Sequence, residues 1–166
     1  MNKSQGYRDN GAVGALLDEY EKALVELKKV IEDVASRKLI KIVDKDTKDK
    51  DCESIQSILS HVVKAGHNYV LEIRSWLGEE VEFKRVESLN SSTEYIEALD
   101  KMFVCNEELF DDYPQLSLEE HNPDNKIKVR WGQKYDVEQL YEHAIVHILR
   151  HRRQIERFKE KIETYN

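Results

Sequence analysis

The chain of 166 residues carries 26 lysines and arginines against 33 aspartates and glutamates, so its formal net charge is −7. It contains only two prolines and six glycines. This composition excludes collagen-like, low-complexity and loop-dominated β architectures and favours long, uninterrupted helices. A negative net charge argues against binding to nucleic acid, because that affinity grows with the number of phosphates that cations neutralise. The length predicts one domain over residues 1–166.

The sequence also bears on the cellular compartment. No run of about 18 apolar residues occurs, so we expect no helix that spans a membrane. The polar segment 1–14 lacks the apolar core of a secretory signal. Two cysteines, Cys52 and Cys105, do not make a disulfide framework. These features favour a cytoplasmic protein.

The first half of the chain shows two segments in which apolar residues recur at steps of three and four, the pattern of an amphipathic helix. The first segment covers residues 15–34. A charged loop, residues 45–51, follows it, and residues 39–43 before that loop are compatible with one short turn. The second helix is expected to begin at Asp51, a good N-cap residue, and to end at Gly78.

The second half shows two more such segments. The third helix is expected from Ser91, which is spaced with Glu94 as a capping box, to about Tyr113. The fourth is expected to begin near Asp136 and to reach the C-terminus. Four amphipathic helices predict an all-α fold, a four-helix bundle with a long loop, residues 114–135, before the last helix.

Two short pieces alternate in polarity as strands do, residues 81–86 (VEFKRV) and 126–131 (KIKVRW). We expect them to pair as a small addition to the helices. Arg130 and Trp131 fall in the second piece and are candidates for a lid over a site.

Three of the six histidines lie four residues apart on the last predicted helix, at His143, His147 and His151. At about 100° per residue they span about 80° of arc. They share this arc with Leu140 and Phe158, so they point into the bundle. A buried imidazole needs a hydrogen-bond partner or a metal, and two histidines at i and i+4 form a chelating pair.

A third ligand must come from a facing helix. His61 is the candidate, because it lies on the flank of the apolar stripe of the second predicted helix. His67 falls on the solvent side of that helix, and His121 falls in the loop between the two prolines, so we exclude both. Without a metal, the same histidines would be hydrogen-bonded residues of the core.

Two segments resemble the DinB/YfiT-like family of metalloenzymes, which is unrelated to the DNA polymerase that shares the DinB name. These are residues 57–63 (SILSHVV) and 143–154 (HAIVHILRHRRQ), the second with an H-x-x-x-H-R-x-Q signature. The resemblance covers residues 12–163 approximately. It implies a four-helix bundle with the helix directions up, down, down and up, and one divalent metal held by three histidines.

Carried over position by position, His61 matches the family's ligand on the second helix, and His147 and His151 match the pair on the last helix. Arg153 stands where many relatives have glycine. His143 is additional, and could be a fourth ligand, a group hydrogen-bonded behind a ligand, or a proton shuttle. Gln154 could hydrogen-bond to a ligand or to substrate.

A three-histidine site leaves coordination positions open, as catalytic sites do. Imidazoles suit Ni, Zn or Fe, and such an ion activates a bound water or thiol. Characterised relatives in the family include thiol transferases, and hydrolysis is the other proposed chemistry. The resemblance thus implies a small thiol and an electrophile as substrates, a role in detoxification or stress response, and compatibility with a homodimer. The alternative is a non-catalytic metal-binding or structural bundle.

Four cations share one arc of the last predicted helix, at Arg150, Arg153, Arg157 and Lys161. Three glutamates of the same helix lie at pairing distance, at Glu156, Glu160 and Glu163. The simpler interpretation is a solvated face of paired charges near a helix C-terminus. The functional alternative is that the arginines grip a carboxylate of the thiol cosubstrate.

Overall fold

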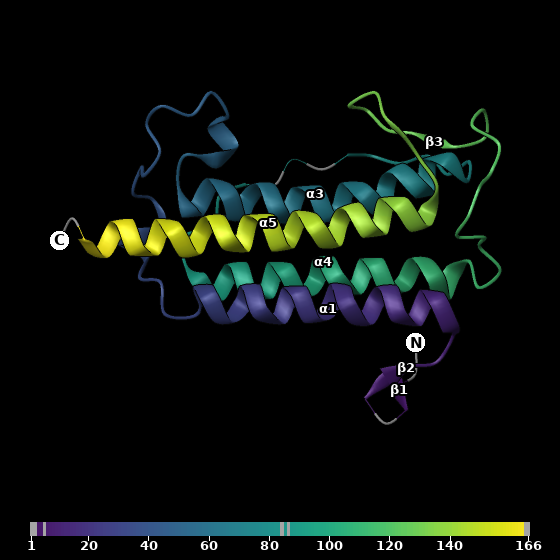
Figure 1. Ribbon diagram of the computed structural model, residues 1–166, viewed down its shortest axis with the longest axis horizontal. Coiled ribbons are helices and arrows are strands. Elements are labelled where there is room, and N and C mark those ends of the chain that lie inside the picture. The colour runs from purple at the N-terminus through teal and green to yellow at the C-terminus, as the bar shows by residue number, and fades with distance from the viewer. Residues whose placement is uncertain (1–2, 5, 84, 86, 165–166) are drawn as a thin grey trace.

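The computed structural model describes residues 3–4, 6–83, 85 and 87–164, and most of these residues are helical, so the predicted all-α class is confirmed. The long helices are α1 (Gly11–Ile31), α3 (Ile55–Trp76), α4 (Ser92–Asp112) and α5 (Val137–Thr164). The helices α1 and α5 run in one direction, and α3 and α4 run in the opposite direction (Figure 1). No helix in the described ranges is long and apolar enough to cross a membrane.

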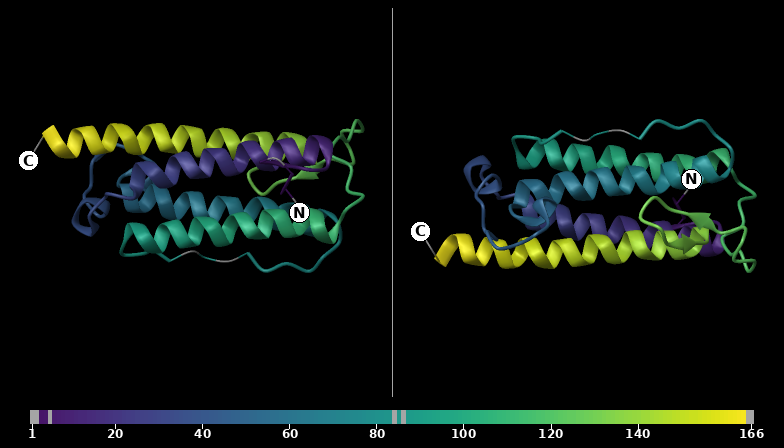
Figure 2. Two further views of the ribbon diagram at one scale, coloured as in Figure 1. Left: turned by 90° about the horizontal axis from the view of Figure 1, so that it is seen from below. Right: turned by 90° about the horizontal axis from the view of Figure 1, so that it is seen from above.

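The four long helices lie side by side around one apolar core (Figures 1 and 2). Each contacts two others, so that α5 lies between α1 and α3, and α4 closes the ring. Each contributes side chains that are fully buried, among them Tyr20, Ile58, Tyr95 and Leu140. Burial of these large apolar side chains is the main force that holds the helices together.

The helix α3 begins later than predicted, because Ser54 and not Asp51 is its N-cap. The Ser54 hydroxyl accepts a hydrogen bond from the backbone N–H of Ser57 at 3.0 Å, and the Ser57 hydroxyl accepts one from the Ser54 N–H at 3.0 Å. This reciprocal pair satisfies two backbone donors at once. Asp51 lies instead in a short 3₁₀ turn, η1 (Lys50–Cys52), ahead of the helix.

The starts of the last two long helices agree with the predicted caps. The Ser91 hydroxyl accepts from the Glu94 N–H at 3.2 Å, and Asp136 Oδ1 accepts from the Gln139 N–H at 2.9 Å. The first helix differs from its predicted range, because it begins at Gly11 and ends at Ile31. Val34 is buried from the turn that follows, so the apolar pattern continues beyond the end of the helix.

The predicted short turn over residues 39–43 lies earlier, as the helix α2 (Ser36–Leu39). Ala35 precedes it with extended backbone, and Leu39 is buried against the core. At the N-terminus, β1 (Lys3–Ser4) and β2 (Tyr7–Arg8) form a small antiparallel hairpin.

The predicted pairing of residues 81–86 with 126–131 is wrong. Residues 84 and 86 lie outside the described residues, and 81–83 and 85 form no strand. The strand β3 (Ile127–Lys128) pairs instead with β4 (Lys134–Tyr135), in the antiparallel register that sets Ile127 opposite Tyr135. A hairpin between neighbours closes a shorter loop, which costs less chain entropy than pairing with a distant segment.

The hairpin of β3 and β4 is anchored to the helix α3. The Trp76 indole donates a hydrogen bond to the backbone oxygen of Asn125 at 2.8 Å, and Ile127 and Val129 are buried. The long loop before α5 is therefore fastened over one end of the α3–α5 seam (Figure 1). This fastening brings residues of the loop next to the histidines of α5.

Candidate metal centre

The three histidines predicted as ligands come together between α3 and α5. The Nε2 atom of His147 lies 2.9 Å from Nε2 of His61 and 3.1 Å from Nε2 of His151. One ligand atom from each residue lies within 4.8 Å of the others. Among the described residues, no other group of three or more histidines, cysteines or acids converges in this way. The three histidines form a group that could hold a metal ion.

The outer ring nitrogens of two of these histidines are fixed by oxygen atoms. Nδ1 of His61 lies 3.2 Å from a carboxylate oxygen of Asp51, and Nδ1 of His151 lies 3.1 Å from the amide oxygen of Gln154. Because both oxygens accept, both Nδ1 atoms carry the proton, and both Nε2 atoms present a lone pair inward. Gln154 thus occupies the position behind a ligand that the sequence suggested.

Hydrogen bonds alone do not satisfy His147. Its Nε2 faces the lone pairs of His61 and His151 and has at most one proton to offer them. Its Nδ1 is buried and has no hydrogen-bond partner among the residues that the structure describes. If the single proton is on Nε2, Nδ1 is an unsatisfied acceptor, and if it is on Nδ1, three lone pairs face one another. A cation at the meeting point satisfies all three Nε2 atoms together.

The spacing of the nitrogens fits a first-row metal ion. Imidazole nitrogens bound at about 2.0–2.1 Å lie about 3.3 Å apart around a tetrahedral ion and about 2.9 Å apart when their bonds are at right angles. The separations from Nε2 of His147 to the other two Nε2 atoms, 2.9 and 3.1 Å, fall close to these values, and all three ligand atoms lie within 4.8 Å of one another. A small movement of the side chains is enough to bind such an ion.

Burial keeps the imidazoles of His147 and His151 neutral, which is the form that binds metal. Burial lowers the pKa of His147 to about 2, and the neighbouring His151 and His61 lower it further. Burial also lowers the pKa of His151 to about 4. The positive charge of Arg150 acts on both in the same direction, so this guanidinium lies close to the centre.

His143 does not belong to the converging group. Its ring stacks on Trp131, with ring centres 5.9 Å apart, and meets the edge of Tyr69 at 5.6 Å. Its ring centre lies 6.2 Å from that of His147. Burial lowers the pKa of His143, so it is a neutral imidazole beside the centre. Of the roles left open by the sequence, this position favours one next to the metal ligands over a fourth ligand.

The centre opens into a cleft of about 560 Å³ whose lining includes His61, His147 and His143. The lid candidates Arg130 and Trp131 both line it. Two contacts hold Arg130 in place, a hydrogen bond from its Nε to buried Glu72 at 2.8 Å and a stacking contact of 3.5 Å over the ring of Phe83. Together with Tyr69, Trp131 gives the cleft an aromatic wall.

Two residues of the site were not identified from the sequence. The sequence predicts Asp51 as a helix cap, but its carboxylate lies next to the imidazole of His61. The signal that could have identified it is an acid in the charged loop ten residues before His61. Tyr69 falls within the second predicted helix, and its ring lies against His143 and His147. Ring contacts of this kind depend on the packing of α3 against α5 and leave no trace in a single helix.

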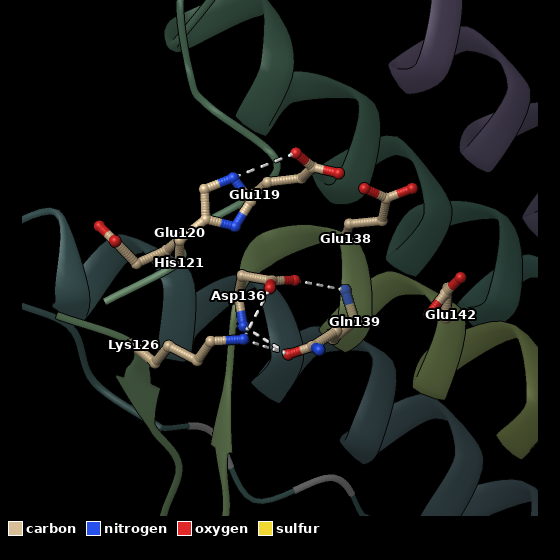
Figure 3. A pocket seen from close by; sticks show the side chains of 8 residues that line it. All are labelled: Glu119, Glu120, His121, Lys126, Asp136, Glu138, Gln139 and Glu142. Atoms are coloured by element: carbon tan, nitrogen blue, oxygen red, sulfur yellow. Dashed lines mark hydrogen bonds and ion pairs between the residues drawn. The ribbon is translucent and has the colours of Figure 1, made fainter. Parts of the chain in front are cut away.

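A second cleft, of about 430 Å³, lies around the start of α5 and is rich in acids (Figure 3). Lys126 donates to Asp136 and to Gln139, both at 2.9 Å, and so neutralises part of its charge. The carboxylates of Glu138 and Glu142 point away from this network and do not meet (Figure 3). The cleft brings no three ligand atoms together in the described part of the chain.

The two excluded histidines lie outside the centre. His121 is exposed, with its imidazole 3.7 Å from Glu119, and His67 is half-buried on α3.

Comparisons with protein-family models, with curated proteins and with solved structures give no match. The resemblance to the DinB/YfiT-like family therefore rests on the two sequence segments and stays a prediction.

Acidification is expected to destabilise the metal-free protein. The folded-state pKa values of His147 and His151, about 2 and about 4, lie below the ordinary 6.5, so the unfolded chain binds these protons first. Stability is complete above about pH 6.5 and falls below it, by about 3 kcal/mol for both residues between pH 7.5 and pH 5.5. Urea unfolding of chelator-treated protein at the two pH values measures this loss.

The variant His147→Gln removes one of the two groups and should lose about half of this pH dependence. The variant His121→Gln, at an exposed site, should retain all of it. Equal stability of the wild type at pH 7.5 and pH 5.5 would contradict the assignment of buried neutral imidazoles.

Proposed function

We propose that the chain binds one divalent metal ion through His61, His147 and His151. The observation that carries this proposal is the convergence of three Nε2 atoms from two helices, with the Nδ1 atoms of His61 and His151 fixed from behind. Imidazole ligands suit Ni, Zn or Fe. The proposal includes the finer fold, a DinB/YfiT-like four-helix bundle, which the helix directions in Figure 1 support.

The activity we propose is metal-dependent transfer of a small thiol to an electrophile, in detoxification or stress response. An ion bound at three histidines would supply Lewis acidity that lowers the pKa of a thiol or of water. His143 is a neutral imidazole in the cleft and is placed to accept the proton released there. The aromatic wall of Tyr69 and Trp131 would exclude water and pack against the apolar part of the electrophile. A cytoplasmic location and a homodimer stay predictions.

Elemental analysis of untagged protein is expected to find about one equivalent of Ni, Zn or Fe per chain. The variants His61→Ala and His147→Ala should both lose it, because each removes one of three ligands and two imidazoles bind far more weakly. The matched control is His121→Ala, which removes an exposed histidine outside the cleft and should retain the metal. Absence of metal after incubation with each of the three ions would refute the metal site.

The hydrogen bonds behind the ligands should tune metal affinity. Asp51→Ala and Gln154→Leu each remove an acceptor that orients a ligating imidazole, and we expect a loss of 10- to 100-fold in affinity, about the cost of losing such partners. Competition with a chromogenic chelator measures it. The control Asp46→Asn changes a charge in the same loop without contact to a histidine. Affinity unchanged in both variants would mean that these contacts do not support the site.

Consumption of an electrophile separates an enzyme from a non-catalytic metal protein. With chlorodinitrobenzene and mercaptoethanol, the metal-loaded protein is expected to accelerate the reaction, and His147→Ala should reduce it to the uncatalysed rate. Turnover that needs water but no thiol would favour a hydrolase. A melting temperature that falls sharply on chelation, without turnover of electrophiles, would favour the structural alternative.

A further inference from the structure

Four cations on one arc of α5 have no partner in the described part of the chain. These are the exposed residues Arg150, Arg153, Arg157 and Lys161, for which the structure gives no ion pair or hydrogen bond. The glutamates expected to pair with these four cations are not seen to do so in the described part of the chain. Glu156 lies 3.5 Å from Arg152, and Glu163 lies 3.9 Å from Lys38. Within the described residues, these four cations therefore form a stripe of positive charge that no side chain neutralises, in a chain of net charge −7.

The four cations line a groove of about 440 Å³, together with Asp44, Gln154 and Phe158. Asp44 is the one acid of this lining, and its Oδ1 already accepts from the backbone N–H groups of Asp46 at 3.3 Å and Thr47 at 3.1 Å. The groove therefore presents a net positive surface with one apolar side chain. Guanidinium groups bind carboxylates and phosphates through two parallel hydrogen bonds, and this makes them suited to anion recognition.

The groove lies beside the histidine centre. Gln154 lines the groove and accepts a hydrogen bond from Nδ1 of His151 at 3.1 Å. Arg150 lines both the groove and the aromatic cleft. Along the helix axis, Arg153 lies about 3 Å and Arg157 about 9 Å beyond His151, at 1.5 Å per residue. Arg150, which shares a face of α5 with Arg157, lies about 10 Å from it along the same axis, so a molecule slightly longer than this spans from the groove into the cleft that His61 and His147 line.

We propose that this groove binds the carboxylate or phosphate group of a small cosubstrate whose other end reaches the histidine centre. The second part of this statement rests on the proposed function. The cosubstrate would then be an acidic thiol. Its anionic group would lie in the groove and its sulfur at the histidines. The aromatic cleft on the other side of the centre is then left for the electrophile.

Anion binding is tested first, by calorimetry with inorganic phosphate and with succinate. Arg153→Gln/Arg157→Gln is expected to weaken binding of the preferred anion at least tenfold. The control Arg37→Gln/Lys101→Gln removes two exposed, unpaired cations outside the groove and should change it less than twofold. Circular dichroism checks that each variant is folded. Equal affinity in wild type and groove variant, or an equal loss in the control, would overturn the proposal.

The variant His147→Ala separates this site from the metal centre. Phosphate binding should persist in it, because the groove does not depend on the metal. Loss of phosphate binding in His147→Ala with retention in Arg153→Gln/Arg157→Gln would place the anion at the metal and overturn the groove. A protein that binds no metal but still binds phosphate through the arginines would refute the proposed function alone.

The link to a thiol is tested with mercaptosuccinate and mercaptoethanol on the metal-loaded protein. Mercaptosuccinate is expected to bind about tenfold or more tightly than mercaptoethanol, and the groove variant should lose this advantage. An advantage that survives in the groove variant would overturn the cosubstrate assignment. Tighter binding of a short DNA duplex than of either small anion, dependent on the same arginines, would identify a nucleic-acid surface and overturn it as well.

Discussion

The contact between the imidazoles of His61 and His147 constrains how closely, and in which register, the helices that carry them pack. It joins α3 to α5 at an Nε2–Nε2 distance of 2.9 Å, so it requires a close approach of the two helices in one register. Buried Ile58 and Val62 on α3 and Ile148 on α5 hold this register from within the core. A shift of one residue along either helix would turn its imidazole by about 100° and separate the nitrogens.

A helix cap has a direct consequence for the site. Because Ser54 and Ser57 cap each other, α3 begins after the charged loop, and Asp51 remains in η1, where its carboxylate reaches Nδ1 of His61. Had the helix begun at Asp51, this side chain would have been engaged by the first backbone N–H groups. The same local preference that starts a helix thus supplies the acceptor that orients a candidate ligand.

The features of the site that could be predicted from the sequence are those that depend on the periodicity of a single helix. The pair of His147 and His151 follows from the period of a helix, and the flank position of His61 follows from its offset from an apolar stripe. The partner of the segment at Ile127 could not be predicted in this way, because alternating polarity identifies a strand and not its neighbour. The contacts of Tyr69 with His143 and His147 could not be predicted either, because they exist only once α3 and α5 have packed together.

The charges of the molecule affect an approaching anion in two ways, at long range through the net charge and at contact distance through local groups. A net charge of −7 repels large anions over the whole surface, whereas the proposed anion groove around Arg153 and Arg157 would attract a small anion at contact distance. At physiological ionic strength the Debye length is about 8 Å, so a small anion within the groove is screened from most of the acidic surface. A polyanion spans many Debye lengths and meets that surface as well. This difference in size favours a small acidic molecule over nucleic acid as the occupant of the proposed groove, which shares Arg150 with the cleft that His61 and His147 line.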